Sequence, residues 1–120
     1  MALLAVAAFA QEGHPLTGTW HGQWTSSTGE KNPIVMALKW DTKNVTGILN
    51  PGRRSGTFKS ITLDAEKWTV HFEADAKDPA GKPVHVVADG KLDNIGSYNR
   101  TIAGTWTQGD VKGDFKITRD

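Results

Sequence analysis

The sequence predicts an all-β protein, an eight-stranded antiparallel up-and-down barrel. No stretch of ten or more residues has apolar side chains at helical spacing. Runs rich in Val, Ile, Thr, Trp and Phe instead recur between clusters of Gly, Pro, Asn and Asp. The links between these runs are short, which favours antiparallel pairing of neighbours, and closure of the sheet removes its exposed edges. A two-sheet β-sandwich is the alternative architecture.

Each predicted strand is bounded by residues that favour turns. The breaks contain the segments SSTGEKNP, DTKN, NPGRRSG, DAEK, DAKDPAGK, DNIGSYN and QGD. The strands are expected at residues 17–26, 33–41, 44–50, 56–63, 67–75, 83–92, 100–107 and 110–118.

Alternation of apolar and polar side chains predicts which face of each strand points inward. In the fourth strand Phe58 is out of phase with Ile61 and Leu63, so a β-bulge is expected between them. The predicted inward-facing residues of the other strands are Trp20, Gly22 and Trp24; Ile34, Met36, Leu38 and Trp40; Trp68, Val70, Phe72 and Ala74; Val84, Val86 and Ala88; Ile102, Gly104 and Trp106; and Val111, Gly113, Phe115, Ile117 and Arg119.

Length, charge and cysteine content exclude several classes of protein. A chain of 120 residues is the size of one domain. It has 14 Lys and Arg against 13 Asp and Glu, a net charge of +1, so no nucleic-acid partner is expected. The chain has no cysteine, which excludes disulfides, a thiolate nucleophile and a cysteine zinc site.

The first ten residues, MALLAVAAFA, differ from the rest of the chain because they are uncharged and apolar or small throughout. They are too short to span a membrane, and Ala8-Phe9-Ala10 fits a signal-peptidase site. Residues 1–10 are therefore interpreted as a signal-peptide remnant and residues 11–120 as the single barrel domain, periplasmic or secreted. A short N-terminal helix is the alternative.

Arg119 shares the inward parity of Phe115 and Ile117, where an unpaired charge would be costly. In a closed barrel the end of the last strand lies beside the start of the first, so Arg119 is expected to stack on Trp20. Together with Gly18-Thr19-Trp20, this pair resembles the calycins, the lipocalins, fatty-acid-binding proteins and avidins. That resemblance implies a ligand-binding barrel, with Trp20 and Arg119 in a structural role.

The order of short motifs along the chain is similar to that of small exported β-barrel proteins of soil bacteria such as acidobacteria. It runs from Gly18-Thr19-Trp20 through Val45-Thr46-Gly47 and the Trp68 segment to Gly104-Thr105-Trp106 and the Phe115 segment. This resemblance implies fold and compartment but no chemistry. The avidins place a polar side chain two positions after the first-strand tryptophan, whereas this chain has Gly22, so a biotin site is not predicted.

The barrel prediction assigns a different role to each end. Trp20, Trp40 and Trp68 are expected to close one end, where the DTKN and DAEK turns are tight. The other end carries longer links and is expected to admit a ligand. The predicted ligand-binding residues are Trp24, Met36, Phe72, Val84 and Trp106 inside the barrel, with Arg53 and Arg54 above them for an anionic group. The alternative is that these aromatic side chains simply fill the interior.

His71 and His85 are the weak candidates for a metal site. A hairpin turn centred near Asp78 would put them opposite each other on the outer face, which Glu73 and Asp89 share. No recognised metal-ligand spacing accompanies them, so solvated surface histidines and no metal are expected.

The sequence thus predicts an exported protein that binds a small apolar or amphiphilic molecule in the barrel mouth, without cofactor or covalent chemistry. A small hydrolase or isomerase acting in the mouth is the first alternative, and a structural or protein-interaction module is the second. No membrane span is expected, and the oligomeric state stays open.

Overall fold

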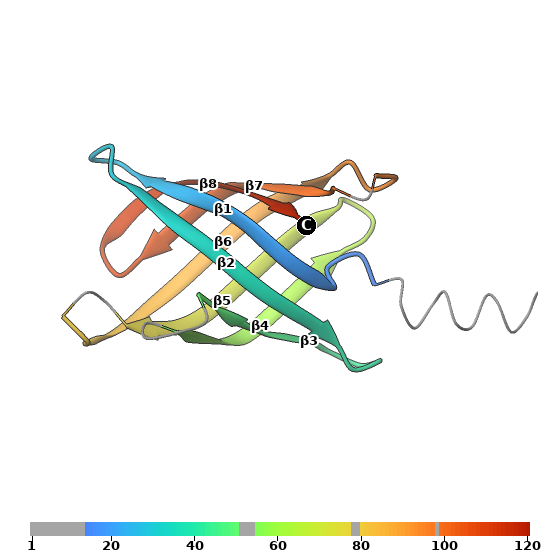
Figure 1. Ribbon diagram of the computed structural model, residues 1–120, viewed down its shortest axis with the longest axis horizontal. Coiled ribbons are helices and arrows are strands. Elements are labelled where there is room, and N and C mark those ends of the chain that lie inside the picture. Colours follow the sequence, from blue (N-terminus) through green and yellow to red (C-terminus); the bar gives the residue numbers. More distant parts are fainter. Residues whose placement is uncertain (1–13, 51–54, 78–79, 98) are drawn as a thin grey trace, which may run out of the picture.

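The computed structural model describes residues 14–50, 55–77, 80–97 and 99–120. These residues form a closed barrel in which every strand pairs antiparallel with its sequence neighbours, and the last strand pairs with the first (Figure 1). The strands are β1 (Gly18–Ser26), β2 (Lys31–Trp40), β3 (Val45–Leu49), β4 (Gly56–Asp64), β5 (Thr69–Lys77), β6 (Pro83–Asp93), β7 (Thr101–Gln108) and β8 (Val111–Arg119).

The barrel confirms the predicted fold class, and the eight strands lie within two residues of their predicted bounds. The sandwich alternative is wrong because β1 and β8 pair along seven residues, from Trp20 with Arg119 to Ser26 with Gly113. The bulge predicted in the fourth strand is also present, as a shift in the β4–β5 register between Phe58 and Ser60.

The predicted inward faces meet in one apolar core, because alternate side chains of all the strands point to the barrel axis. Burial of these side chains removes apolar area from water and is the main stabilising term. The core residues are Leu16, Trp20, Trp24, Ile34, Met36, Leu38, Leu49, Val70, Phe72, Ala74, Val86, Ala88, Leu92, Ile102, Trp106, Phe115 and Ile117. Val111 departs from the prediction: it is exposed, because β8 begins there beside the tight β7–β8 turn.

The two ends of the barrel are made by different links. The β1–β2, β3–β4, β5–β6 and β7–β8 links form one end, hereafter the mouth end, at the left of Figure 1. The opposite end, hereafter the Trp20 end, carries the other three hairpin links and the residues that precede β1. Within the described part of the chain there is no long apolar helix of the kind that crosses a membrane.

The ladder of hydrogen-bonded pairs is incomplete between β3 and β4, although these strands are consecutive in the chain. β3 and β4 pair at Ile48 with Thr57 and at Leu49 with Gly56. By contrast, β4 pairs with β5 as far as Asp64 with Thr69. β3 and β4 therefore separate toward the Trp20 end and leave an opening in the wall.

Candidate functional site

An aromatic cluster occupies the barrel interior toward the mouth end. The indoles of Trp24 and Trp106 are stacked with their ring centroids 6.1 Å apart, and Phe115 meets Trp106 edge-on at 5.6 Å. On the other side of the barrel Phe58 and Phe72 contact each other at 5.7 Å. Such aromatic pairs contribute stability beyond the area they bury.

β-Sheet parity brings the predicted ligand-binding residues of the interior to this cluster. Trp24 is 6% exposed and Trp106 is 1% exposed, whereas Met36 and Phe72 are fully buried and Val84 is half-buried. The Trp106 indole Nε1 donates a hydrogen bond of 3.2 Å to the Gln108 side chain, so its one polar atom is satisfied within the wall.

Arg53 and Arg54 lie outside the described residues, so their role in recognising an anionic group stays a prediction.

At the opposite end the structure places Trp20 beside Arg119, as the sequence predicts. The two residues are register partners across the β1–β8 ladder. Trp20 is fully buried, and its Nε1 donates a hydrogen bond of 2.9 Å to the Leu16 carbonyl oxygen. Arg119 reaches back to the residues before β1, where it donates to the Thr17 carbonyl oxygen at 3.3 Å. Indole and guanidinium together tie the chain start to the barrel.

The Trp20 end is not closed by the three tryptophans that the sequence predicts. Trp40 and Trp68 are only half-buried there, and Trp68 precedes β5 instead of belonging to it. The buried side chain that joins Trp20 is Leu16, which the sequence analysis missed. It comes from the segment before β1, which Arg100 holds by donating to the Pro15 carbonyl oxygen at 3.1 Å.

His71 and His85 lie on the outer wall but not opposite each other. The β5–β6 register pairs His71 with Asp89 and Asp75 with His85, so the hairpin is centred two residues later than predicted. Each imidazole Nδ1 therefore meets an aspartate across the ladder, at 2.6 Å for Asp89 and 3.2 Å for Asp75. Glu73 lies between the two rings and contacts the Nε2 atom of both.

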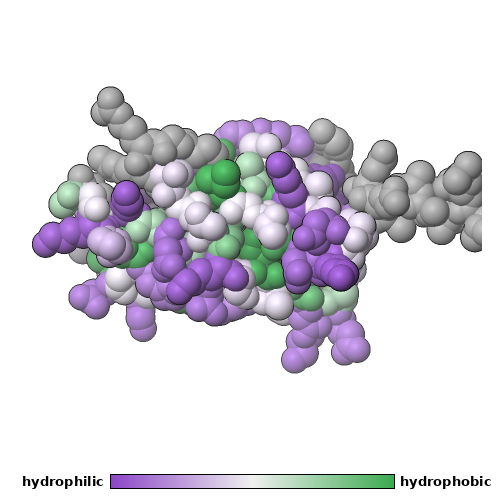
Figure 2. Space-filling model, turned by 90° about the horizontal axis from the view of Figure 1, so that it is seen from below, coloured by the Kyte–Doolittle hydropathy of each residue, from purple (hydrophilic) through white to green (hydrophobic). Residues whose placement is uncertain are grey.

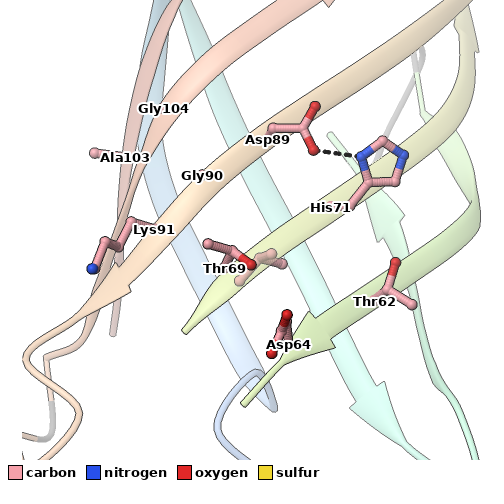
Figure 3. Close-up of a pocket in the computed structure, with 10 residues that line it drawn as sticks. Thr62, Asp64, Thr69, His71, Asp89, Gly90, Lys91, Ala103 and Gly104 are labelled. Atoms are coloured by element: carbon pink, nitrogen blue, oxygen red, sulfur yellow. Dashed lines mark hydrogen bonds and ion pairs between the residues drawn. The ribbon is translucent and has the colours of Figure 1, made fainter. Parts of the chain in front are cut away.

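A shallow groove of about 490 Å³ adjoins this histidine network on the outer wall. It crosses β4, β5, β6 and β7, and Figure 3 shows the His71–Asp89 pair at one side and Lys91 at the other. The groove forms because the small residues Gly90, Ala103 and Gly104 lie between longer side chains. The structure adds this groove to the candidate sites that the sequence predicts.

Hydrogen bonding within the network changes the pKa of several groups. The hydrogen bond with Asp89, and then that with Glu73, raises the pKa of His71 above its ordinary value of 6.5. The same contact with His71 lowers the pKa of Glu73 below 4.5, and the contact with His85 lowers that of Asp75 below 3.8. Among the described residues, no three potential ligands are grouped so that they could hold a metal ion.

These directions predict the pH range in which the network stabilises the fold. Stabilisation from His71 is present below pH 6.5, the ordinary pKa of histidine, and is lost as the pH rises through the higher pKa in the folded protein. Stabilisation from Glu73 is present above pH 4.5 and is lost as the pH falls through its lowered pKa. The network therefore contributes most between these two values, and only modestly because it is exposed to solvent.

We expect an NMR titration to place the pKa of His71 above 6.5, and Asp89→Asn to lower it because the strongest hydrogen bond to the imidazolium is weakened. Asp93→Asn is the matched control, on the same strand but paired with Thr101, and should leave the His71 titration unchanged. A His71 pKa at or below 6.5 would contradict the hydrogen-bond geometry.

The fold and interior define a small closed antiparallel β-barrel with an aromatic core at one end, and comparison with known proteins agrees with this class. No known protein family and no curated protein matches the chain. Two solved structures are similar, both redesigned β-barrels bound to DFHBI. The barrel called mFAP1 matches with a TM-score of 0.61 and 16% identity over 88% of this chain and 95% of its own. The barrel called mFAP0 matches with a TM-score of 0.60 and 18% identity over 89% and 100%. At these identities the likeness shows the fold alone.

Proposed function

We propose that the protein binds a small apolar or amphiphilic molecule at the mouth end of the barrel, without a cofactor and without covalent chemistry. The observation that carries this proposal is the aromatic cluster around Trp24 and Trp106. Its side chains are broad and apolar and have few rotatable bonds, so a ligand that replaces part of their mutual packing would be bound at a low entropic cost. Met36 and Phe72 lie deeper among the buried core residues, and Val84 is half-buried.

Both similar structures are barrels bound to a small molecule, which supports binding as the activity compatible with this architecture. Trp24 keeps a small exposed fraction, whereas the interior aromatic residues below it are covered. A ligand would therefore enter by displacing links at the mouth end and by taking the place of side-chain contacts around Trp24. Arg53 and Arg54, in the β3–β4 link, are proposed to meet the anionic group of an amphiphile.

We further propose that the barrel is of the calycin type and that it acts in the periplasm or outside the cell. The register of Trp20 against Arg119 supports the first part, since the resemblance implies a basic residue of the last strand beside the first-strand tryptophan. The apolar residues 1–10, which end in Ala8-Phe9-Ala10, support the second.

A dansyl-labelled fatty acid tests the binding proposal. We expect its emission to rise and tryptophan emission to fall on mixing with the protein, and Trp106→Leu to weaken binding about tenfold, because the stacked indole pair is lost. Arg53→Ala should weaken binding of the acid but not of its methyl ester. Lys112→Ala, an exposed cation near the start of β8 at the same end, is the matched control.

If the folded Trp106→Leu protein binds the probe as tightly as the original protein, the mouth end is not the site. If the Arg53→Ala and Lys112→Ala proteins lose affinity for the acid equally, the arginine has no specific role.

A further inference from the structure

The opening between β3 and β4 is the one place where the described barrel wall lacks its ladder. The two strands pair only near the mouth end, at Ile48 with Thr57 and at Leu49 with Gly56. On the far side of β3 the ladder with β2 continues to Trp40 with Val45. The backbone of β3 nearer the Trp20 end thus has a partner strand on one side and an opening on the other.

Apolar side chains that point inward are only half-buried around this opening. Val45 lies on one side of it, and Ile61 and Leu63 lie on the other. Inward-facing side chains of the same kind, such as Ile34 and Ile102, are buried where the ladder is complete. Figure 2 views the side on which β3 and β4 lie in Figure 1, and apolar atoms are visible there between polar side chains.

A cavity of about 470 Å³ lies at the opening, large enough for a small organic molecule. Its walls come from β3, β4, the turns beside them and the segment before β1. The side chains that define its chemistry are His14, Lys43, Val45, Ile61, Leu63 and Trp68.

The lining combines apolar and aromatic side chains with the polar side chains of Asn44 and Thr62, the His14 ring and one cation. Burial lowers the pKa of His14, so this ring is neutral at neutral pH, and it lies 5.3 Å from the Trp40 ring. Lys43 is the charged group among the residues that line the cavity, and it is exposed at the rim. A molecule with a flat apolar body and one anionic group would match this arrangement.

The backbone of Trp68 is a second, independent observation. Its φ angle is +56°, in the left-handed region that glycine and asparagine favour and bulky residues avoid. The conformation costs about 1 kcal/mol for a residue with a Cβ atom. Trp68 adopts it at the end of the β4–β5 turn, where its carbonyl oxygen accepts a 2.8 Å hydrogen bond from the Leu92 N–H. A glycine here would remove the strain but also the largest side chain of the cavity wall.

We propose that the β3–β4 opening is a binding site for a small aromatic molecule that carries a carboxylate or sulfonate. Trp68 and the half-buried side chains of Val45, Ile61 and Leu63 contact the aromatic body, and Lys43 attracts the anionic group. The site is at the opposite end of the barrel from the mouth, so it does not depend on the proposed function above.

Two probes of nearly equal shape separate the two parts of this proposal. Anilinonaphthalene sulfonate carries the anionic group, and N-phenylnaphthylamine lacks it. We expect Lys43→Met to weaken the sulfonate about threefold, as for an exposed ion pair, and to leave the uncharged probe unchanged. Lys67→Met, an exposed lysine in the β4–β5 turn that does not line the cavity, is the matched control and should change neither.

Trp68→Gly and Trp68→Ala should each weaken both probes about tenfold. The glycine variant relieves the backbone strain, so its melting temperature should be no lower than that of the alanine variant. Weaker probe binding by the glycine variant then cannot be attributed to unfolding. With isotope-labelled protein, the sulfonate should shift amide signals of residues 43–45 and 61–69. Shifts confined to Trp24 and Trp106 would place the probe at the mouth end and overturn the proposal. Unchanged probe affinity in folded Trp68→Gly protein would also overturn it.

Discussion

Replacing Trp20 with alanine is expected to lower the free energy of unfolding by about 3–5 kcal/mol. The indole is fully buried at the point where β1, β8 and the segment before β1 meet. Its removal leaves a cavity that the hydrogen-bonded barrel wall cannot fill by moving inward. It also leaves the Leu16 carbonyl oxygen without the 2.9 Å hydrogen bond from Nε1. Denaturant unfolding followed by far-ultraviolet circular dichroism measures the loss.

Two further variants separate the contributions of volume and hydrogen bond. Trp20→Phe keeps a ring but no donor, so its loss should lie between zero and that of the alanine variant. Trp40→Ala removes a half-buried indole from the same end and should cost less than Trp20→Ala. A Trp20→Ala protein within about 1 kcal/mol of the original would show that the Trp20 end is not held by this side chain.

Strand bounds and inward faces could be predicted because each depends on neighbours in the sequence. Period-two alternation places Phe72 and Trp106 on the inner face whatever the rest of the chain does, since one residue of slip would expose them. The bulge in β4 followed from the same rule, because Phe58 and Ile61 cannot share a face without an extra residue. Closure followed from the need to remove two sheet edges.

The β5–β6 register could not be predicted in the same way. Several residues between Asp75 and Pro83 favour turns, so composition alone does not choose the centre of the hairpin. Moving the centre of the hairpin by two residues shifts each partner by four, which keeps every inward face inward. It exchanges a His71–His85 pair for the His71–Asp89 and Asp75–His85 pairs. Parity therefore predicts a core more securely than it predicts a surface cluster.

The β3–β4 opening and the docking of Leu16 were missed because both depend on contacts far apart in the chain. The prediction made the third strand, residues 44–50, nearly as long as its neighbours, whereas in the structure β3 has five residues and β2 and β4 have ten and nine. A short strand cannot complete ladders with two longer partners along their full length. Leu16 gave no periodic signal because it precedes the first strand, and Arg100 and Arg119 hold its segment from the other end of the sequence.

Gly22 shows why resemblance to the avidins does not extend to a biotin site. The position points into the barrel two residues after Trp20, where the avidins carry a polar side chain. Here the neighbouring strand leaves no room for one, because a methyl carbon at Gly22 would lie 1.9 Å from the Lys116 carbonyl oxygen and 2.7 Å from Ile117 Cα. Both atoms belong to the β8 backbone, which cannot move aside like the end of a flexible side chain.

Gly22→Ala is therefore expected to destabilise the barrel by about 3 kcal/mol or more, the upper range for forced overpacking, because β1 and β8 must move apart where they close the sheet. Gly96→Ala is the matched control: it introduces the same methyl group in the β6–β7 link, where no atom beyond its chain neighbours lies within 4 Å. It should change the free energy of unfolding by less than about 0.5 kcal/mol. Equal stability of the two variants would mean that β1 and β8 are not in close backbone contact at Gly22. A large loss for Gly22→Ala alone would show that β1 and β8 are in close backbone contact at the seam between the first and last strands, near the Trp20–Arg119 pair.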